Sequence, residues 1–256
     1  MLKHAIVRPP AANFDMGLTS VDFGKPDLAL ARDQHARYCA ALQGCGLELT
    51  RLEADANFPD STFVEDTAVL TPQAAILTRP GAPSREGEVI GIGRALRRVY
   101  SRFHVITAPG TVDGGDVCAA NGHFFIGLSE RTNAEGARQL AGYLDKEGFT
   151  SAVVDIRGID GILHLKSGIS YLGENRLVLI DALAAWPVFH GYEIVRVPAG
   201  ESYAANLLRI NGHAIIPAGY PCFETALRDL GYATIALDMS EFRKMDGALT
   251  CLSLRF

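Results

Sequence analysis

The stretch 246–256 at the end of the chain alternates apolar and polar residues and carries a cysteine, Cys251, close to the C-terminus. A free cysteine is most often a small buried hydrophobe, and for Cys251 alone that interpretation is the default. Polar residues elsewhere, on or leading into other apolar runs, favour a second interpretation, in which the last strand delivers a thiolate to a shared site. These residues are Glu65, Asp66, Asp113, Asp116, His164 and Asn206.

A thiol, an imidazole and carboxylates that meet in one cleft suit nucleophilic attack on a cationic, electron-poor carbon. The thiolate of Cys251 would attack, because it is the strongest side-chain nucleophile near neutral pH. His164 would protonate the leaving amine and then activate water, and Asp113 would orient the imidazole. The set therefore predicts hydrolysis of a guanidinium group whose charge is held by carboxylates.

Carboxylates buried on apolar strands cost on the order of several kcal/mol each unless they are paired or bind a cation. The alternative to a reactive site is therefore that these polar groups satisfy one another and the nearby backbone. This alternative applies first of all to Asp116 and Asn206. By the same reasoning, Arg85 and Arg131 taken alone would be surface ion-pair residues.

The elements that would position these residues repeat a pattern of apolar strand, tight turn, second apolar strand and, usually, helix. Asn121-Gly122 and Asn211-Gly212 are the strongest turn signals, because a two-residue hairpin turn needs positive φ at both positions. The predicted strand pairs are 63–70 with 74–78, 116–120 with 123–127, 164–172 with 176–180, and 205–210 with 213–217. The predicted helices are 86–100, 133–147 and 223–230.

The two ends of the chain supply a fifth copy of the pattern. Residues 248–256 would form its first strand, residues 3–8 its second, and residues 26–42 its helix, with Pro26 in the first helical turn. Such ββα-type units cannot bury their faces alone and would close into a ring. We expect one α/β domain, residues 1–256, with the first strand of each unit along a central channel. A mixed α/β sheet with chance alternation is the alternative.

Composition limits the classes of function. The chain has 256 residues, 48% of them hydrophobic, which is enough for a sizeable core. The net charge of -5 argues against a nucleic-acid surface, and no apolar run reaches membrane-spanning length. The five cysteines are widely scattered, so neither a disulfide framework nor a structural zinc site is predicted. These features predict a soluble, cytoplasmic protein.

Motifs along the whole chain resemble, in order, those of the dimethylarginine dimethylaminohydrolases of the pentein (guanidino-group modifying) superfamily. They are FPDSTFVED at 58–66, TRPGAPSR at 78–85, DGGD at 113–116, SERTN at 129–133, LHLKS at 163–167 and DGALTC at 246–251. The resemblance implies a pentein five-bladed α/β propeller. It also implies hydrolysis of Nω-methylated arginines to citrulline and a methylamine, without a cofactor or a metal ion.

The resemblance also assigns catalytic roles. Cys251 matches the nucleophile that forms a covalent thiouronium-type intermediate, His164 the general acid and base, and Asp113 the acidic partner of the histidine. A thiol and an imidazole in one cleft also predict adventitious inhibition by zinc.

Six further positions match the family's substrate-binding residues. Two carboxylates lie at the guanidinium end, two arginines clamp the α-carboxylate, and a carboxylate and a backbone carbonyl bind the α-amine. In that order, these are Glu65 and Asp66, Arg85 and Arg131, and Asp60 with Leu18. Leu18 lies in the loop 16–20, which resembles the family's mobile lid, with Gly17 as a hinge.

Three other functions stay open. An arginine deiminase would release ammonia from unmethylated arginine, and an amidinotransferase would pass the amidino group to an amine. Both are usually longer than this chain. A non-catalytic pentein-type binding protein has no reason to keep a thiol, an imidazole and an arginine clamp together. The expected partner is a small-molecule substrate, while a homodimer and the preferred degree of methylation are left open.

Overall fold

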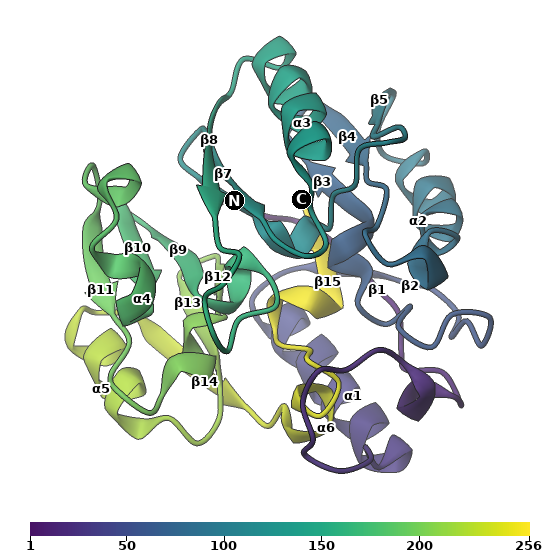
Figure 1. Cartoon of the computed structure of the whole chain (residues 1–256). Coiled ribbons are helices and arrows are strands. Elements are labelled where there is room, and N and C mark those ends of the chain that lie inside the picture. The colour runs from purple at the N-terminus through teal and green to yellow at the C-terminus, as the bar shows by residue number, and fades with distance from the viewer. The chain divides into compact units, whose positions relative to one another are not determined.

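The computed structural model describes residues 1–256 and forms two compact units. The first, which we call the terminal unit, contains Met1–Val64 and Pro198–Phe256, and the second, the middle unit, contains Glu65–Val197. Each unit contains more than one three-stranded sheet, and all of these sheets have the same strand order (Figure 1). The expected single domain of residues 1–256 stays a prediction.

The repeated sheet has the same order in every copy: two antiparallel strands, then a third strand parallel to the middle one. The middle unit holds three copies. Their strands are β3 (Ala68–Leu70), β4 (Ala74–Leu77) and β5 (Arg102–Val105), then β6 (Val117–Ala120), β7 (His123–Leu128) and β8 (Thr150–Asp155), then β9 (Ile169–Gly173), β10 (Arg176–Leu179) and β11 (Glu193–Arg196).

The terminal unit holds two copies, and one of them joins the ends of the chain. One copy consists of β12 (Leu208–Ile210), β13 (His213–Pro217) and β14 (Ala233–Leu237). The copy that joins the chain ends consists of β15 (Ser253–Arg255), β1 (His4–Val7) and β2 (Glu48–Arg51). β15 pairs antiparallel with β1, with Leu254 opposite Ile6. The predicted copy made from both chain ends is therefore confirmed, and the five sheets fit the predicted five-blade arrangement.

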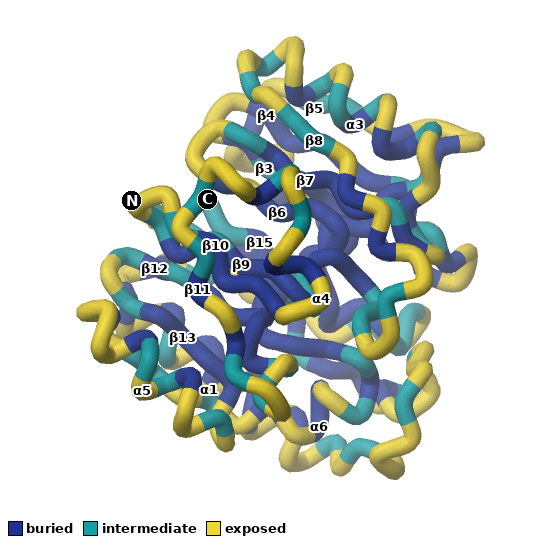
Figure 2. Tube along the Cα trace, turned by 60° about the vertical axis from the view of Figure 1, so that its left-hand side comes forward, coloured by how far each residue is buried: buried dark blue, intermediate teal, exposed yellow.

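The third strand of each sheet was missed by the sequence analysis. These strands, β2, β5, β8, β11 and β14, are largely exposed, whereas the middle strands are almost entirely buried (Figure 2). An exposed edge strand needs no apolar alternation, so its sequence carries little strand signal. The repeat is ββαβ rather than the expected ββα.

Six helices connect the strands: α1 (Leu28–Gly44), α2 (Glu88–Leu96), α3 (Ala134–Lys146), α4 (Asp181–Ala184), α5 (Pro221–Asp229) and α6 (Ser240–Arg243). The predicted placement of Pro26 in the first turn of α1 was wrong, because Asp27 caps the helix by accepting the Leu30 N–H at 3.0 Å. Asn133 caps α3 in the same way. None of the helices combines the length and apolar character that crossing a bilayer requires.

The two Asn-Gly hairpin turns are confirmed. Asn121 and Gly122 have φ of 50° and 84°, and Asn211 and Gly212 have φ of 44° and 99°. Such positive values are those that a two-residue primed turn requires. The turns fix the register of the strands that they join, so that Ala120 pairs with His123.

A short 3₁₀ turn precedes the first strand of every sheet, and three of these turns, η2, η5 and η8, fall inside stretches that were predicted to be unbroken strands. The turns are η2 (Val64–Thr67), η4 (Gly114–Asp116), η5 (Leu165–Ser167), η7 (Ser202–Ala205) and η8 (Thr250–Leu252). In a strand, successive side chains point to opposite faces. A 3₁₀ turn breaks that alternation, so that neighbouring polar residues such as Glu65 and Asp66 are both buried without a strand pattern.

Candidate active site

The 3₁₀ turns carry most of the polar residues that the sequence analysis singled out. These residues were predicted to lie on or lead into the first strands, and the structure shows that they lead into them. Glu65 and Asp66 lie in η2, Asp116 in η4 and Cys251 in η8, while Asp113, His164 and Asn206 lie one residue outside a turn. Glu65, Asp66, Asp113 and His164 belong to the middle unit, and Asn206 and Cys251 to the terminal unit.

His164 and Asp113 form a buried pair in the middle unit. The imidazole Nε2 lies 3.0 Å from Asp113 Oδ2, and Asp113 Oδ1 accepts the Gly81 N–H at 2.8 Å. Burial lowers the pKa of His164, but three carboxylates outweigh burial and raise that pKa to about 9. They are those of Asp66, Asp116 and Asp113. At neutral pH the imidazole is therefore an imidazolium beside a carboxylate.

Asp116 is satisfied by three donors, as the structural alternative predicted. It accepts the Ser129 hydroxyl at 2.6 Å, the Thr132 hydroxyl at 2.7 Å and the Leu165 N–H at 2.9 Å. Burial nevertheless raises the pKa of Asp116. Ser129 and Thr132 belong to the motif SERTN, but no role was predicted for either. Their spacing of three residues, typical of a hydroxyl-capped turn, is the signal that could have found them.

Arg85 is buried between two carboxylates. Its Nη1 donates to Asp66 Oδ2 at 2.6 Å, and its Nε and Nη2 donate to Glu88 at 2.8 to 3.2 Å. Burial lowers the pKa of Arg85, but the two carboxylates hold it well above its usual value. The surface ion-pair alternative was therefore wrong for Arg85, which is an internal countercharge to Asp66. Its role in a carboxylate clamp stays a prediction.

Glu65 is also paired. Lys166 Nζ lies 2.7 Å from Glu65 Oε1 and 3.2 Å from the carbonyl oxygen of Gly114. Gly114 must be glycine here, because a Cβ would stand 2.1 Å from the Glu65 carbonyl oxygen. The pairing of Lys166 was not predicted, since nothing in the sequence shows where its side chain points.

Arg131, by contrast, has a side chain with no hydrogen bond or ion pair. Its backbone N–H donates to Ser129 Oγ at 3.0 Å, and a Cβ at Gly81 would stand 2.1 Å from its carbonyl oxygen. The backbone of Arg131 is thus held tightly while its half-buried side chain keeps its donors unused. An arginine in this state can bind an incoming carboxylate through two parallel hydrogen bonds.

In the terminal unit, the loop 16–20 is docked against two aspartates. The Leu18 N–H lies 3.1 and 3.2 Å from the two oxygens of the buried Asp60 carboxylate. The Ser20 backbone and hydroxyl both donate to Asp246 Oδ2. A Cβ at Gly17 would stand 2.4 Å from Asp60 Oδ1, so only glycine lets the loop lie this close. The predicted pair of Leu18 and Asp60 is thus adjacent.

Cys251 differs from the other cysteines in its exposure. It is half-buried in η8 just before β15, whereas Cys39, Cys45 and Cys118 are buried and Cys222 is exposed. Burial raises the pKa of Cys118 to about 12, and the charge of Glu201 raises the pKa of Cys222. Four of the five thiols are thus either inaccessible or held in the unreactive thiol form.

Asp66, Asp113 and His164 lie close enough together to hold a metal ion, with donor atoms within 4.8 Å of one another. Their donors already have partners, however. His164 Nε2 bonds to Asp113, while the two oxygens of Asp66 accept the Gly115 N–H and the Arg85 guanidinium. The positive charge that a metal would supply is thus provided by Arg85 and the imidazolium.

Comparison with known proteins adds the family. The chain is 46% identical to the N(G),N(G)-dimethylarginine dimethylaminohydrolase of Pseudomonas aeruginosa, and the match covers 100% of both chains. It is 34% identical to the enzyme of the same name from Streptomyces coelicolor, over 99% of this chain and 96% of the relative. The chain belongs to the dimethylarginine dimethylaminohydrolase family. No protein-family model matches it.

A solved structure extends this finding to the fold. A cysteine-to-serine variant of the P. aeruginosa dimethylarginine dimethylaminohydrolase, complexed with citrulline, matches with a TM-score of 0.97 at 46% identity, over 100% of both chains. The predicted pentein fold is therefore confirmed, with the five three-stranded sheets as its blades. The resemblance seen in the sequence motifs is confirmed with it.

Proposed function

We propose that the chain hydrolyses Nω,Nω-dimethyl-L-arginine, and Nω-monomethyl-L-arginine, to L-citrulline and dimethylamine or methylamine. It is a hydrolase that acts on an amidine C–N bond of a small-molecule substrate through a covalent thiol intermediate. The observation that carries this proposal is the 46% identity over the full chain to a dimethylarginine dimethylaminohydrolase, supported by the match to its citrulline complex.

In the first half of the proposed reaction, Glu65 and Asp66 hold the guanidinium and the thiolate of Cys251 attacks its central carbon. The C–S bond forms, and the bond from this carbon to the dimethylamino nitrogen breaks. The imidazolium of His164 gives its proton to the departing dimethylamine, which leaves a neutral imidazole and a cationic thiouronium on Cys251. The raised pKa of His164 supports this step, because the acid form is present at neutral pH.

In the second half, water attacks the thiouronium carbon and His164 takes the proton from the water. The C–S bond then breaks, citrulline is released with loss of one proton to solvent, and the thiolate and imidazolium return. Asp113 keeps Nε2 of His164 engaged throughout. We therefore assign the proton transfer to the other ring nitrogen, Nδ1. The same nitrogen thus serves as acid and then as base.

Arg131 is proposed to bind the α-carboxylate. Arg85, which donates to Asp66, is proposed to contribute positive charge. Arg131→Lys keeps the charge but loses the planar fork. We expect the KM for dimethylarginine to rise about 10- to 100-fold while kcat changes less than about 3-fold. Steady-state kinetics measure both, and Arg138→Lys, at an exposed arginine of α3, is the matched control. An unchanged KM would remove Arg131 from the clamp.

Asp60 and the Leu18 carbonyl are proposed to bind the α-amine under the docked loop. Gly17→Ala would place a Cβ 2.4 Å from Asp60 Oδ1, so the loop could not dock as it does. We expect the KM to rise more than about 10-fold, with an unchanged melting temperature, because the loop adds little to the core. Gly142→Ala, where a Cβ meets nothing within 4 Å, is the control. Wild-type KM in Gly17→Ala would contradict this role.

The test of the proposed function is a product assay. Purified protein is incubated separately with dimethylarginine and with arginine, and citrulline, dimethylamine and ammonia are quantified. We expect equal amounts of citrulline and dimethylamine from the first and little ammonia from the second. Ammonia from arginine at a comparable rate would make the protein an arginine deiminase, and no citrulline from either substrate would refute hydrolysis.

We place the protein in the cytoplasm, because all five of its cysteines are free thiols, which suits a reducing compartment. Size-exclusion chromatography with light scattering would decide between a monomer and the homodimer left open by the sequence.

A further inference from the structure

Three hydrogen bonds of one kind connect the five 3₁₀ turns that precede the sheets. In each case the side chain of a residue in or just after one turn accepts the backbone N–H of the turn that opens the next sheet. The pairs are Asp66 with Gly115 (η2 to η4), Asp116 with Leu165 (η4 to η5), and Asn206 with Thr250 (η7 to η8), and each distance is 2.9 Å. We call these contacts braces.

We propose that Asn206 is the positioning residue of the nucleophile, and that its lack of charge is part of that role. The inference rests on the proposed function, in which Cys251 attacks the substrate. Asn206 Oδ1 accepts the N–H of Thr250, the residue directly before Cys251, and Asn206 Nδ2 donates to Thr250 Oγ1 at 3.0 Å. Both residues are 3% exposed, so water does not compete for these bonds.

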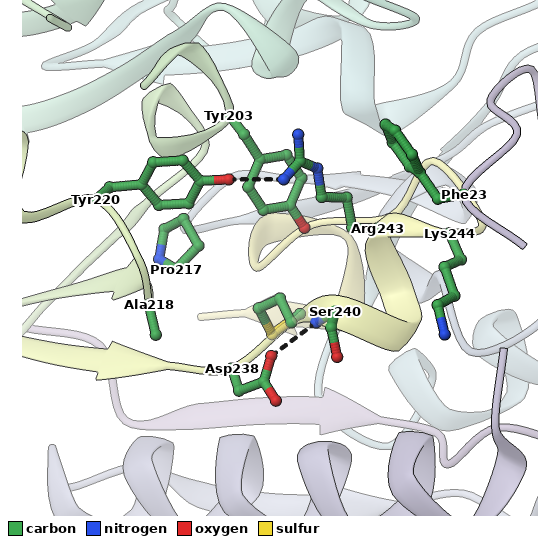
Figure 3. Close-up of a pocket in the computed structure, with 10 residues that line it drawn as sticks. Phe23, Tyr203, Pro217, Ala218, Tyr220, Asp238, Ser240, Arg243 and Lys244 are labelled. Carbon is green, nitrogen blue, oxygen red and sulfur yellow. Dashed lines mark hydrogen bonds between the residues drawn. The ribbon is translucent and has the colours of Figure 1, made fainter. Parts of the chain in front are cut away.

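A second side chain from η7 holds the other end of the same loop. The Tyr203 hydroxyl donates to the Gly247 carbonyl oxygen at 2.8 Å. Figure 3 shows Tyr203 in the wall of a cavity of about 300 Å³, beside Arg243, whose guanidinium carbon lies 4.9 Å from the ring centroid. Burial, together with the charge of Cys251, raises the pKa of Tyr203, so its hydroxyl stays a donor. The loop 247–250 is thus fixed at both ends from η7.

The braces differ in charge: two of them use a carboxylate and the third uses a neutral amide. The charge of each brace suits the catalytic residue that lies near it. Asp66 and Asp116 carry negative charge toward His164, where it favours the imidazolium. A carboxylate beside Cys251 would instead disfavour the thiolate. Asn206 offers the same acceptor oxygen without the charge. Cys251 lies two residues before the start of β15. Asp66 lies two residues before β3 and Asn206 two residues before β12, so the three side chains occupy equivalent positions in the repeat.

The test compares two substitutions at one position. Asn206→Asp keeps the acceptor for Thr250 and adds a charge, while Asn206→Leu keeps the size and removes the acceptor. Asn211→Asp is the matched control, because Asn211 also bonds to backbone in the terminal unit but at the β12–β13 turn. The readouts are the pH dependence of Cys251 alkylation by iodoacetamide, located by peptide mass spectrometry, and kcat and KM for dimethylarginine.

For Asn206→Asp we expect the midpoint of Cys251 alkylation to move up by about one pH unit, since a negative charge bonded to Thr250, the residue next to Cys251, disfavours the thiolate. Its kcat at pH 7 should fall about 10-fold and recover at more alkaline pH, with KM within about 3-fold. For Asn206→Leu we expect kcat to fall about 100-fold at every pH, because the loop is no longer fixed. Asn211→Asp should keep the wild-type alkylation profile.

An Asn206→Asp protein with the wild-type alkylation profile would overturn the role of charge, and wild-type kcat in Asn206→Leu would overturn positioning. An Asn206→Asp protein that fails to fold would also contradict the inference, because a carboxylate keeps the acceptor to which the brace is assigned. Alkylation needs no substrate. If the wild-type protein fails to hydrolyse dimethylarginine, the proposed function falls while the alkylation profile still decides the role of Asn206.

Discussion

Replacing Cys251 by serine should abolish citrulline formation and leave dimethylarginine binding intact. Serine keeps the size of the side chain, but its hydroxyl is hardly ionised near neutral pH and is a far weaker nucleophile than a thiolate. We expect kcat to fall by about 10⁴-fold or more. The affinity for dimethylarginine, measured by titration calorimetry, should change less than about 3-fold, because binding is assigned to other residues.

Cys222→Ser is the matched control, since Cys222 is the exposed thiol of the chain. It should retain wild-type kcat. Substantial turnover by Cys251→Ser would show that another group attacks the guanidinium carbon. Loss of binding together with turnover would show that the substitution damaged the site as a whole.

Asp113→Asn should produce the second largest loss of activity. The amide cannot supply the negative charge that favours the imidazolium, and it can hold the imidazole in the wrong orientation. We expect kcat to fall about 10²- to 10⁴-fold, the range for removing the acidic member of such a unit. Because Asp113 raises the pKa of His164 through both its hydrogen bond and its charge, the alkaline limb of kcat against pH should move to lower pH in the variant.

The same pair makes folding stability depend on pH. The pKa of His164 is about 9 in the folded protein and 6.5 ordinarily. A group whose pKa is raised on folding stabilises the fold fully below its unfolded pKa, and that contribution is lost as pH rises through the folded value. The free energy of unfolding, measured with urea, should therefore fall between about pH 6.5 and pH 9. Asp113→Asn should show a smaller fall, and an equal fall would contradict the pairing.

Much of the fold could be predicted because its signals are local. Asn121-Gly122 and Asn211-Gly212 fix two hairpins through backbone conformation alone, and the apolar alternation on either side marks the strands. Because the strand-turn-strand pattern recurs along the chain, a further copy built from both chain ends could be predicted. β1 and β15 indeed pair. A long repeat supplies the long-range information that a single strand lacks.

The parts that were missed depend on contacts rather than on pattern. The exposed third strands need only an edge to pair with, and a 3₁₀ turn of three or four residues has no periodicity to detect. Buried partners such as Glu88 of Arg85 and Lys166 of Glu65 are polar residues whose direction only the folded chain determines. The sequence thus identified the charged groups but not which of them neutralise one another.

Hydrolysis is proposed to proceed through a covalent intermediate on Cys251. The direct measurement is the intact mass of the protein, acid-quenched during turnover of dimethylarginine, followed by peptide mapping. We predict an added mass equal to the substrate less dimethylamine, located on Cys251, and the same added mass from monomethylarginine, because both substrates leave the same thiouronium. An adduct on another thiol, such as Cys222, or a different added mass from each substrate, would contradict the account.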